Sequence, residues 1–236
     1  HVDGPHVLHG AADVIVGGPY YGSDGGVARL YLGSSTGLDT AYANQDTGGQ
    51  AGAEFGYSVA TAGDVNGDGY ADVIVGSPMW TNGENDEGRA LVWLGSANGI
   101  HPTRDWVVEG DSVGAWYGFS VATAGDVNGD GYSDIIVGAP HRDTESGATF
   151  AYYGGPDSLE ETASWTKVSN LEDALFGWSV SSAGDVVADG YADVVVGAPY
   201  WDGGQADEGQ AWVYMGSGAG LESAPDWHKQ SNQAGA

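Results

Sequence analysis

The sequence predicts an all-β protein made of about four repeated units. Glycine is frequent, with 42 of 236 residues, and it marks many turns because no G-X-Y period runs through it. Short runs of aromatic and β-branched residues lie between these glycines, and long helical stretches are hard to find. The sequence also repeats itself at a spacing of about 60 residues, which is typical of a repeat architecture.

The clearest unit covers residues 55–78 and recurs at residues 117–140 and 176–199. Near the N-terminus only its second half is present, at residues 12–19. Each unit continues with a strand that ends in a glycine turn and with a later aromatic residue. In the second unit the candidate strands are residues 55–63, 71–77, 88–95 and 104–109. Four short antiparallel strands per unit build one blade of a β-propeller, so we expect a propeller of about four blades.

We assign the whole chain to one propeller domain whose units are residues 1–53, 54–115, 116–174 and 175–236, the first lacking most of its first strand. Small residues such as Ser58 and Ala60 in the first strand suit the crowded centre, where blades converge. Residues 233–236 match residues 50–53, so the units would follow one another around a circle. The alternative is that the chain is a fragment or half of a larger ring of six to eight blades. As half of a ring, it would be completed by a second chain.

Charge and composition exclude several classes of partner. The net charge is −27, from 33 acidic and six basic residues, so nucleic acid and anionic membranes are poor partners. No apolar run approaches the roughly 20 residues of a membrane span, so we expect no membrane insertion. The chain has no cysteine, which removes disulfides and thiolate metal sites without settling the compartment. The acidity fits both a solvated acidic surface and carboxylates that converge on cations.

Two loops carry oxygen-bearing residues at positions 1, 3, 5 and 9 and glycine at position 6, with a backbone carbonyl expected at position 7. Hard oxygen ligands in a flexible loop suit Ca²⁺. Position 12 is valine instead of the EF-hand glutamate and the flanks resemble strands, so each loop joins the first two strands of a blade. A single copy would also fit an ordinary polar turn, but two copies at one place in a repeat favour calcium. The expected ligands are Asp64, Asn66, Asp68, Tyr70 and Asp72 in one loop, and Asp126, Asn128, Asp130, Tyr132 and Asp134 in the other.

A third loop is incomplete. Val187 replaces the asparagine and Ala188 replaces the first glycine, so we expect a weaker third calcium site. Its remaining candidate ligands are Asp185, Asp189, Tyr191 and Asp193. The first unit keeps only Asp13, and we expect no site there because the other ligand positions hold Pro5, Val7 and His9.

The pairs Phe55-Gly56, Tyr117-Gly118 and Phe176-Gly177 precede the segments 76–78, 138–140 and 197–199, which read Gly-Ser-Pro or Gly-Ala-Pro. With the intervening loops, these segments resemble the FG-GAP repeats of integrin α-subunits. The resemblance implies a propeller whose calcium loops lie on one face and whose opposite face recognises protein partners. Similar repeats occur in a glycan-binding fungal lectin, a phospholipase-associated domain and bacterial surface proteins. The well-known members have seven blades, whereas this chain holds about four.

The loops between the second and third strands lie on the face away from calcium in such a propeller. They could form a stacking rim for sugars or an anchor for a peptide, or they could pack between blades. Arg142 could receive a carboxylate or form a surface salt bridge. The candidate ligand-binding residues are Tyr20, Tyr21, Trp80, His141, Arg142, Tyr200 and Trp201.

Signals of enzymatic activity are weak, and we expect no enzyme. Ser58, Ser120 and Ser179 recur with the fold and lack the nucleophile-elbow pattern. His1, His6 and His9 cluster in an irregular segment that binds a metal adventitiously or is a loosely ordered end. The leading interpretation is an extracellular or cell-surface adhesion module that binds a protein or peptide, as a monomer or a ring-completing dimer. The alternatives are a calcium-stiffened lectin and an accessory domain of a surface enzyme.

Overall fold

The computed structural model describes residues 12–235 apart from residues 24 and 98. Within that part of the chain the only helix is the four-residue α1 (Arg142–Glu145), and the other elements are β-strands. The all-β expectation is therefore confirmed. The histidines at positions 1, 6 and 9 lie outside the described residues, as do Pro5, Val7 and the start of the first unit.

Three antiparallel sheets have four strands each, ordered along the chain. The second sheet comprises β6 (Ser58–Gly63), β7 (Asp72–Ser77), β8 (Arg89–Trp93) and β11 (Trp106–Glu109). The third comprises β12 (Ser120–Gly125), β13 (Asp134–Ala139), β14 (Ala148–Tyr152) and β15 (Trp165–Val168). The fourth comprises β16 (Ser179–Gly184), β17 (Asp193–Ala198), β18 (Gln210–Tyr214) and β19 (Trp227–Gln230). This repeated four-stranded architecture is the expected β-propeller blade.

The first sheet, among the described residues, contains β1 (Val14–Gly18), β2 (Val27–Tyr31) and β5 (Asn44–Thr47). Two small hairpins follow β2 in the first sheet and β8 in the second sheet. They are β3 (Gly33–Ser34) with β4 (Gly37–Leu38), and β9 (Gly95–Ser96) with β10 (Gly99–Ile100).

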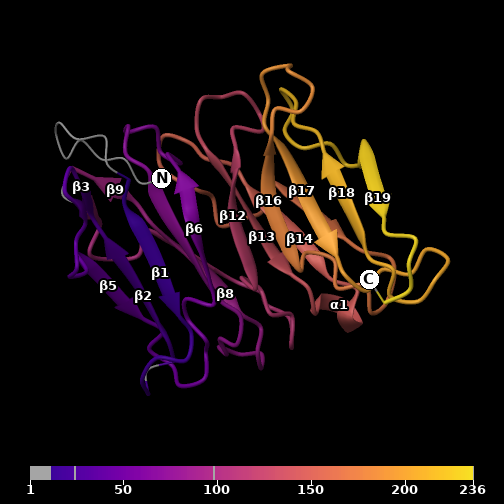
Figure 1. Ribbon diagram of the computed structural model, residues 1–236, viewed down its shortest axis with the longest axis horizontal. Coiled ribbons are helices and arrows are strands. Elements are labelled where there is room, and N and C mark those ends of the chain that lie inside the picture. Colours follow the sequence, from indigo (N-terminus) through magenta and orange to yellow (C-terminus); the bar gives the residue numbers. More distant parts are fainter. Residues whose placement is uncertain (1–11, 24, 98, 236) are drawn as a thin grey trace.

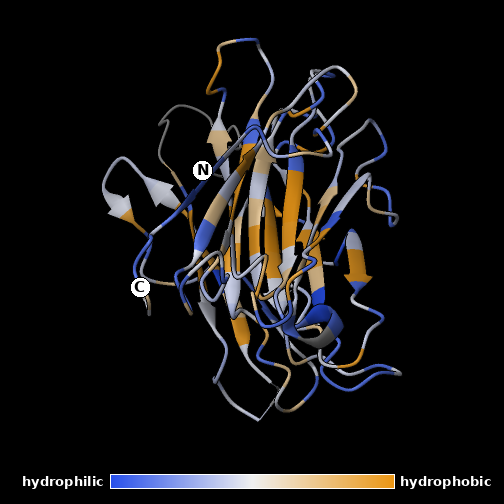
Figure 2. Cartoon of the chain, turned by 90° about the vertical axis from the view of Figure 1, so that its right-hand side faces the viewer, coloured by the Kyte–Doolittle hydropathy of each residue, from blue (hydrophilic) through white to orange (hydrophobic). Residues whose placement is uncertain are grey.

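The sheets follow one another in sequence order as an open arc (Figure 1). The innermost strands β6, β12 and β16 lie side by side, and β1 lies beside β6. The first and fourth sheets lie at opposite ends of the molecule, so the expected circle of four blades is not closed within the described residues. Apolar segments gather along the strands and hydrophilic ones in the loops (Figure 2).

The core lies between neighbouring sheets. Ile74 and Trp106 of the second sheet pack with Val137 and Phe150 of the third in one buried cluster. A second cluster joins the third sheet to the fourth, and a third joins the first sheet to the second. Each sheet is therefore stabilised by its neighbours, as in other repeat proteins.

Backbone contacts at each junction explain why the repeat needs two glycines. Ser58 donates a hydrogen bond from its hydroxyl to the Gly118 carbonyl of the next sheet, with an O···O distance of 2.7 Å. A methyl group at Gly76 would overlap that carbonyl, and Gly118 itself has a φ of +82°. The repeated glycines therefore let two sheets approach closely and let the chain adopt a left-handed conformation between them.

Candidate metal loops and ligand surface

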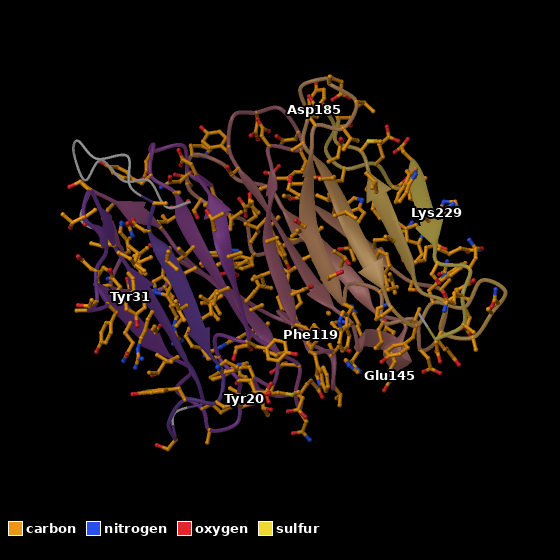
Figure 3. The ribbon with its side chains drawn as sticks, viewed as in Figure 1. Tyr20, Tyr31, Phe119, Glu145, Asp185 and Lys229 are labelled. Carbon is orange, nitrogen blue, oxygen red and sulfur yellow. The ribbon has the colours of Figure 1, made fainter. Side chains whose placement is uncertain are left out.

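The three predicted metal loops join the first and second strands of the second, third and fourth sheets. We call them the second-sheet loop (residues 64–72), the third-sheet loop (126–134) and the fourth-sheet loop (185–193). They lie at one end of the molecule, where Asp185 is labelled in Figure 3. Each first strand ends at a register shift next to a glycine with positive φ, which turns the chain into the loop.

The second-sheet loop folds around its own acidic side chains. Asp64 accepts hydrogen bonds at Oδ1 from the N–H groups of Gly67 (2.7 Å) and Asp68 (3.1 Å), and at Oδ2 from that of Gly69 (2.8 Å). Asn66 Nδ2 donates to Asp68 Oδ2 at 3.0 Å. The third-sheet loop repeats these bonds around Asp126, with corresponding distances of 2.7, 3.1 and 2.9 Å. The two loops thus have the matching geometry that their sequences predict.

The aspartate at position 9 of each loop has a structural role that the sequence did not reveal. Asp72 is fully buried, and its two oxygens accept from the N–H groups of Val65 (2.8 Å) and Gly95 (2.7 Å). Its carboxylate therefore ties the metal loop to the turn that follows the third strand. Asp134 and Asp193 make the same pair of bonds in their sheets. In the first sheet, Asp13 accepts from the N–H of Gly33 at 2.8 Å.

Burial raises the pKa of Asp72 to about 7, and the nearby Asp68 and Asp64 carboxylates raise it further, against the opposing effect of the two N–H donors. Asp134 has the same environment, and burial likewise raises its pKa to about 7. Each complete loop thus brings three carboxyl groups close enough to repel one another when ionised.

The donor set of each complete loop fits a hard cation. Among the described residues no three His, Cys, Asp or Glu side chains converge on one point, so carboxylates alone do not form a site. One half-buried carboxylate, one exposed carboxylate, one amide oxygen and backbone carbonyls remain in each loop, and these are oxygen ligands of the kind that Ca²⁺ accepts. Asp72 and Asp134 have both oxygens bonded to the backbone, and their part in coordination stays a prediction.

The fourth-sheet loop keeps the backbone path but not all the donors. Ala188 has a φ of +60°, close to the +73° of Gly67 at the same loop position. Asp185 still accepts from the N–H groups of Asp189 (3.1 Å) and Gly190 (2.9 Å), and the Gly190 bond is the main cause of its lowered pKa. Val187 is exposed where the other loops have asparagine, so an amide ligand is missing.

The predicted ligand-binding residues separate into packed and exposed groups. Trp80 donates from Nε1 to Glu109 Oε1 at 2.8 Å, and the Arg89 guanidinium lies 3.3 Å from its ring centroid. Trp201 packs edge-on against Trp212, with ring centroids 6.1 Å apart. Both tryptophans therefore pack against side chains of their own sheets.

Other members of the predicted set remain accessible. Tyr20 is 78% exposed, and Tyr21 and Tyr200 are also exposed. Arg142 lines a cavity of about 290 Å³ between the second and third sheets, where its Nε lies 3.6 Å from Asp143 Oδ2. His141 is partly buried, and its ring centroid lies 3.7 Å from that of Trp116.

Three aromatic residues that the sequence analysis did not single out form a row across the second, third and fourth sheets. Tyr57, Phe119 and Trp178 each follow the glycine of an aromatic-glycine pair and precede the innermost strand. Their ring centroids are 4.8 Å apart between Tyr57 and Phe119, and 4.5 Å apart between Phe119 and Trp178. Tyr57 and Trp178 are exposed on either side of the buried Phe119. Figure 3 places Phe119 and Tyr20 at the end of the molecule opposite Asp185.

Comparisons with known proteins agree with this architecture. Residues 55–93, 117–153 and 176–214 match the FG-GAP repeat family. Integrin alpha-PS2 of Drosophila melanogaster is 36% identical over 166 residues, covering 64% of this chain and 12% of the relative. Integrin alpha-V of Gallus gallus is 31% identical over 201 residues, covering 80% of this chain and 19% of the relative. The chain thus spans less than a fifth of the length of these relatives.

Among solved structures, an exotype rhamnogalacturonan lyase, YesX, is 13% identical with a TM-score of 0.41. The alignment covers 91% of this chain and 42% of the lyase. No helix in the described part of the chain is both long and apolar enough to cross a membrane.

Proposed function

Because the chain is built from FG-GAP repeats and is an integrin-like β-propeller, we propose that it is an extracellular or cell-surface module that binds a protein or peptide. In this proposal calcium stiffens one end of the molecule and the ligand contacts the other, without enzymatic turnover. The observation that carries the proposal is the separation of the acidic loops from the aromatic row (Figure 3).

Two loops would hold Ca²⁺ and a third would hold it more weakly. Oxygens of Asp64, Asn66 and Asp68, the Tyr70 carbonyl and Asp72 would serve the second-sheet loop. The corresponding residues 126–134 would serve the third-sheet loop, and Asp185, Asp189, Tyr191 and Asp193 the weaker site. A bound cation would offset the negative charge that each loop gathers around its backbone N–H groups.

Calcium removal tests this part of the proposal. With a Kd of about 10⁻⁴ M, a hundredfold excess of calcium adds roughly 2.7 kcal/mol per site, so chelation should lower the melting temperature. Magnesium should restore it poorly, because the smaller ion demands octahedral geometry. The matched variant Asp64→Asn/Asp126→Asn should lose most of the response to chelation. An unchanged melting curve, with metal-free protein confirmed by elemental analysis, would refute structural calcium.

The ligand proposal rests on the chemistry of the aromatic row. Tyr57 and Trp178 present exposed rings on a chain with a net charge of −27. Aromatic faces attract cations and anchor apolar side chains, so a peptide with basic and apolar residues suits this surface. The same net charge repels nucleic acid and anionic membranes.

A displayed peptide library, selected on the calcium-loaded chain, tests the ligand proposal. Selected peptides should be rich in Arg, Lys and apolar residues, and Trp178→Ala should weaken their binding at least about tenfold. Trp227→Ala is the matched control, since Trp227 is an exposed tryptophan on the fourth strand of its sheet. Equal losses in the two variants, or no selectable peptide, would contradict the assignment of this surface.

Glycan binding is a second candidate because Tyr20, Tyr21 and Tyr200 expose their rings on loops between second and third strands. Exposed aromatic rings can stack on sugar rings. A glycan array that gives several strong hits of related structure, all lost in Tyr20→Ala/Tyr21→Ala, would favour a lectin over a peptide-binding module. A flat array would remove this candidate.

A further inference from the structure

The metal loops of neighbouring sheets touch one another through residues 132–133. Ser133 donates from its N–H to the carbonyl of Asp64 at 2.8 Å, and its hydroxyl accepts from the N–H of Asp64 at 3.1 Å. The Tyr132 ring covers Gly67, where an added Cβ would lie only 2.7 Å from the ring carbon Cε1. The backbone on both sides of the Asp64 side chain is thus held by the third-sheet loop.

The next junction repeats part of this arrangement. Ala192 donates from its N–H to the carbonyl of Asp126 at 2.9 Å, and the Tyr191 ring covers Gly129. Alanine has no hydroxyl, so the second bond that Ser133 makes has no counterpart at Ala192. The contact between the third- and fourth-sheet loops is therefore the weaker of the two.

Both contact residues belong to a proposed calcium site. Tyr132 supplies the position-7 carbonyl of the third-sheet loop, while its ring packs against the second-sheet loop. Ser133 holds Asp64, the first ligand of the second-sheet loop, from a position directly before Asp134. Any ordering of residues 126–134 by a cation therefore restrains the backbone that presents Asp64.

We propose that the second- and third-sheet loops bind calcium with positive cooperativity, and that Tyr132 and Ser133 are the positioning residues that couple them. The proposal rests on the proposed calcium function. A cation in one loop removes conformational freedom that the neighbouring loop would otherwise lose on binding, so the second ion binds more tightly. By thermodynamic linkage the effect is reciprocal, and each loop strengthens the other by the same factor.

Calorimetric titration of the metal-free chain with CaCl₂ tests the coupling. All proteins carry Asp185→Asn, which silences the fourth-sheet loop. Asp126→Asn and Asp64→Asn then give the binding constant of each remaining loop alone. The coupling factor is the overall constant of the two-loop protein divided by the product of these two constants, and we expect it to be about five or more.

The variant Tyr132→Ala/Ser133→Ala keeps every proposed side-chain ligand and the position-7 carbonyl. Its coupling factor, measured with the same loop-silencing substitutions, should fall to about one if these residues carry the cooperativity. Tyr191→Ala is the matched control, because it removes the same ring from the other junction and should leave the factor unchanged. If the double variant fails to fold, Ser133→Ala alone is the substitute. It should fold, since Ala192 occupies the same position in the fourth-sheet loop. It should still reduce the coupling factor, because it removes the hydroxyl that accepts from the N–H of Asp64.

Each outcome is decisive. An absence of calcium heat in the parent chain would overturn the proposed calcium function itself. Two bound ions with a coupling factor of one would overturn cooperativity while leaving calcium binding intact. A factor that persists in the Tyr132/Ser133 variant would overturn the assignment of the coupling residues.

Discussion

Two tryptophans at the same position of different sheets have very different surroundings. Trp106 of β11 is 4% exposed, its ring centroid lies 4.9 Å from that of Tyr152, and its Nε1 donates to the Glu160 carbonyl at 2.9 Å. Trp227 of β19 is 49% exposed on the outer face of the fourth sheet. Truncation to alanine should therefore cost much more stability at Trp106 than at Trp227.

The difference follows from buried area. A tryptophan side chain can bury up to about 250 Å², so the gap in exposure corresponds to roughly 110 Å². At about 25 cal/mol per Å² this area contributes about 3 kcal/mol. We expect Trp106→Ala to lower the free energy of unfolding by about 3–5 kcal/mol, since it also leaves a cavity. Trp227→Ala should lower it by about 1 kcal/mol or less, as for other surface truncations.

Urea unfolding followed by circular dichroism measures both variants in the same calcium concentration. The midpoint should shift strongly for Trp106→Ala, with little change for Trp227→Ala. Equal losses would refute the reasoning, because they would show that the outer face of the fourth sheet is covered in solution. Sedimentation of the unmodified chain would then identify a second copy as the cover.

Two further predictions concern buried ionisable groups. In calcium-free buffer, Asp72→Ala should lower the free energy of unfolding by about 2–5 kcal/mol, because it leaves two buried N–H donors without an acceptor. Asp68→Ala, in the exposed part of the loop, should lower it by less than about 1 kcal/mol. Urea unfolding in EDTA measures both variants, and equal losses would contradict the structural role of Asp72. Burial lowers the pKa of His141 despite the neighbouring Glu145, so the folded state resists protonation. The contribution of His141 to stability should therefore fall as the pH drops below about 6.5, and between pH 7.5 and 5.5 the unmodified chain should lose stability relative to His141→Phe. An identical pH dependence in that variant would contradict the assignment.

The sequence predicted the existence of the strands better than their limits. The residues expected to open the first strand of the second sheet, 55–57, precede β6. Phe55 donates from its N–H to the carbonyl of Gly25 in the first sheet at 2.7 Å, so it docks on a neighbour before its own sheet begins. Alternating apolar residues fix a strand within one unit, whereas this contact depends on how two units pack.

The packing of the aromatic side chains near the loops was predicted less well, for a similar reason. Trp80 and Trp201 resemble exposed loop aromatics in sequence, but each packs beside side chains of its own sheet. Tyr57, Phe119 and Trp178 resemble interior residues at the start of strands. They form a surface row only because the innermost strands of successive sheets lie side by side. The signal in the sequence was the second aromatic residue of the repeated aromatic-glycine-aromatic motif.

The first unit distinguishes two roles of the aspartate at position 9, which are hydrogen bonding to backbone N–H groups and coordination of a cation. Its sequence lacks the alternating oxygen donors of the other loops, yet it keeps Asp13. If position 9 served only a cation, nothing in that unit would favour an aspartate. The bond from the Gly33 N–H to Asp13 supplies a reason that is independent of metal, and Asp72 makes the same bond to Gly95. The primary role of the aspartate at position 9 is therefore to hydrogen-bond within its sheet. Any part that it takes in calcium binding is limited to the loops that also have the other oxygen donors, such as Asp64, Asn66 and Asp68.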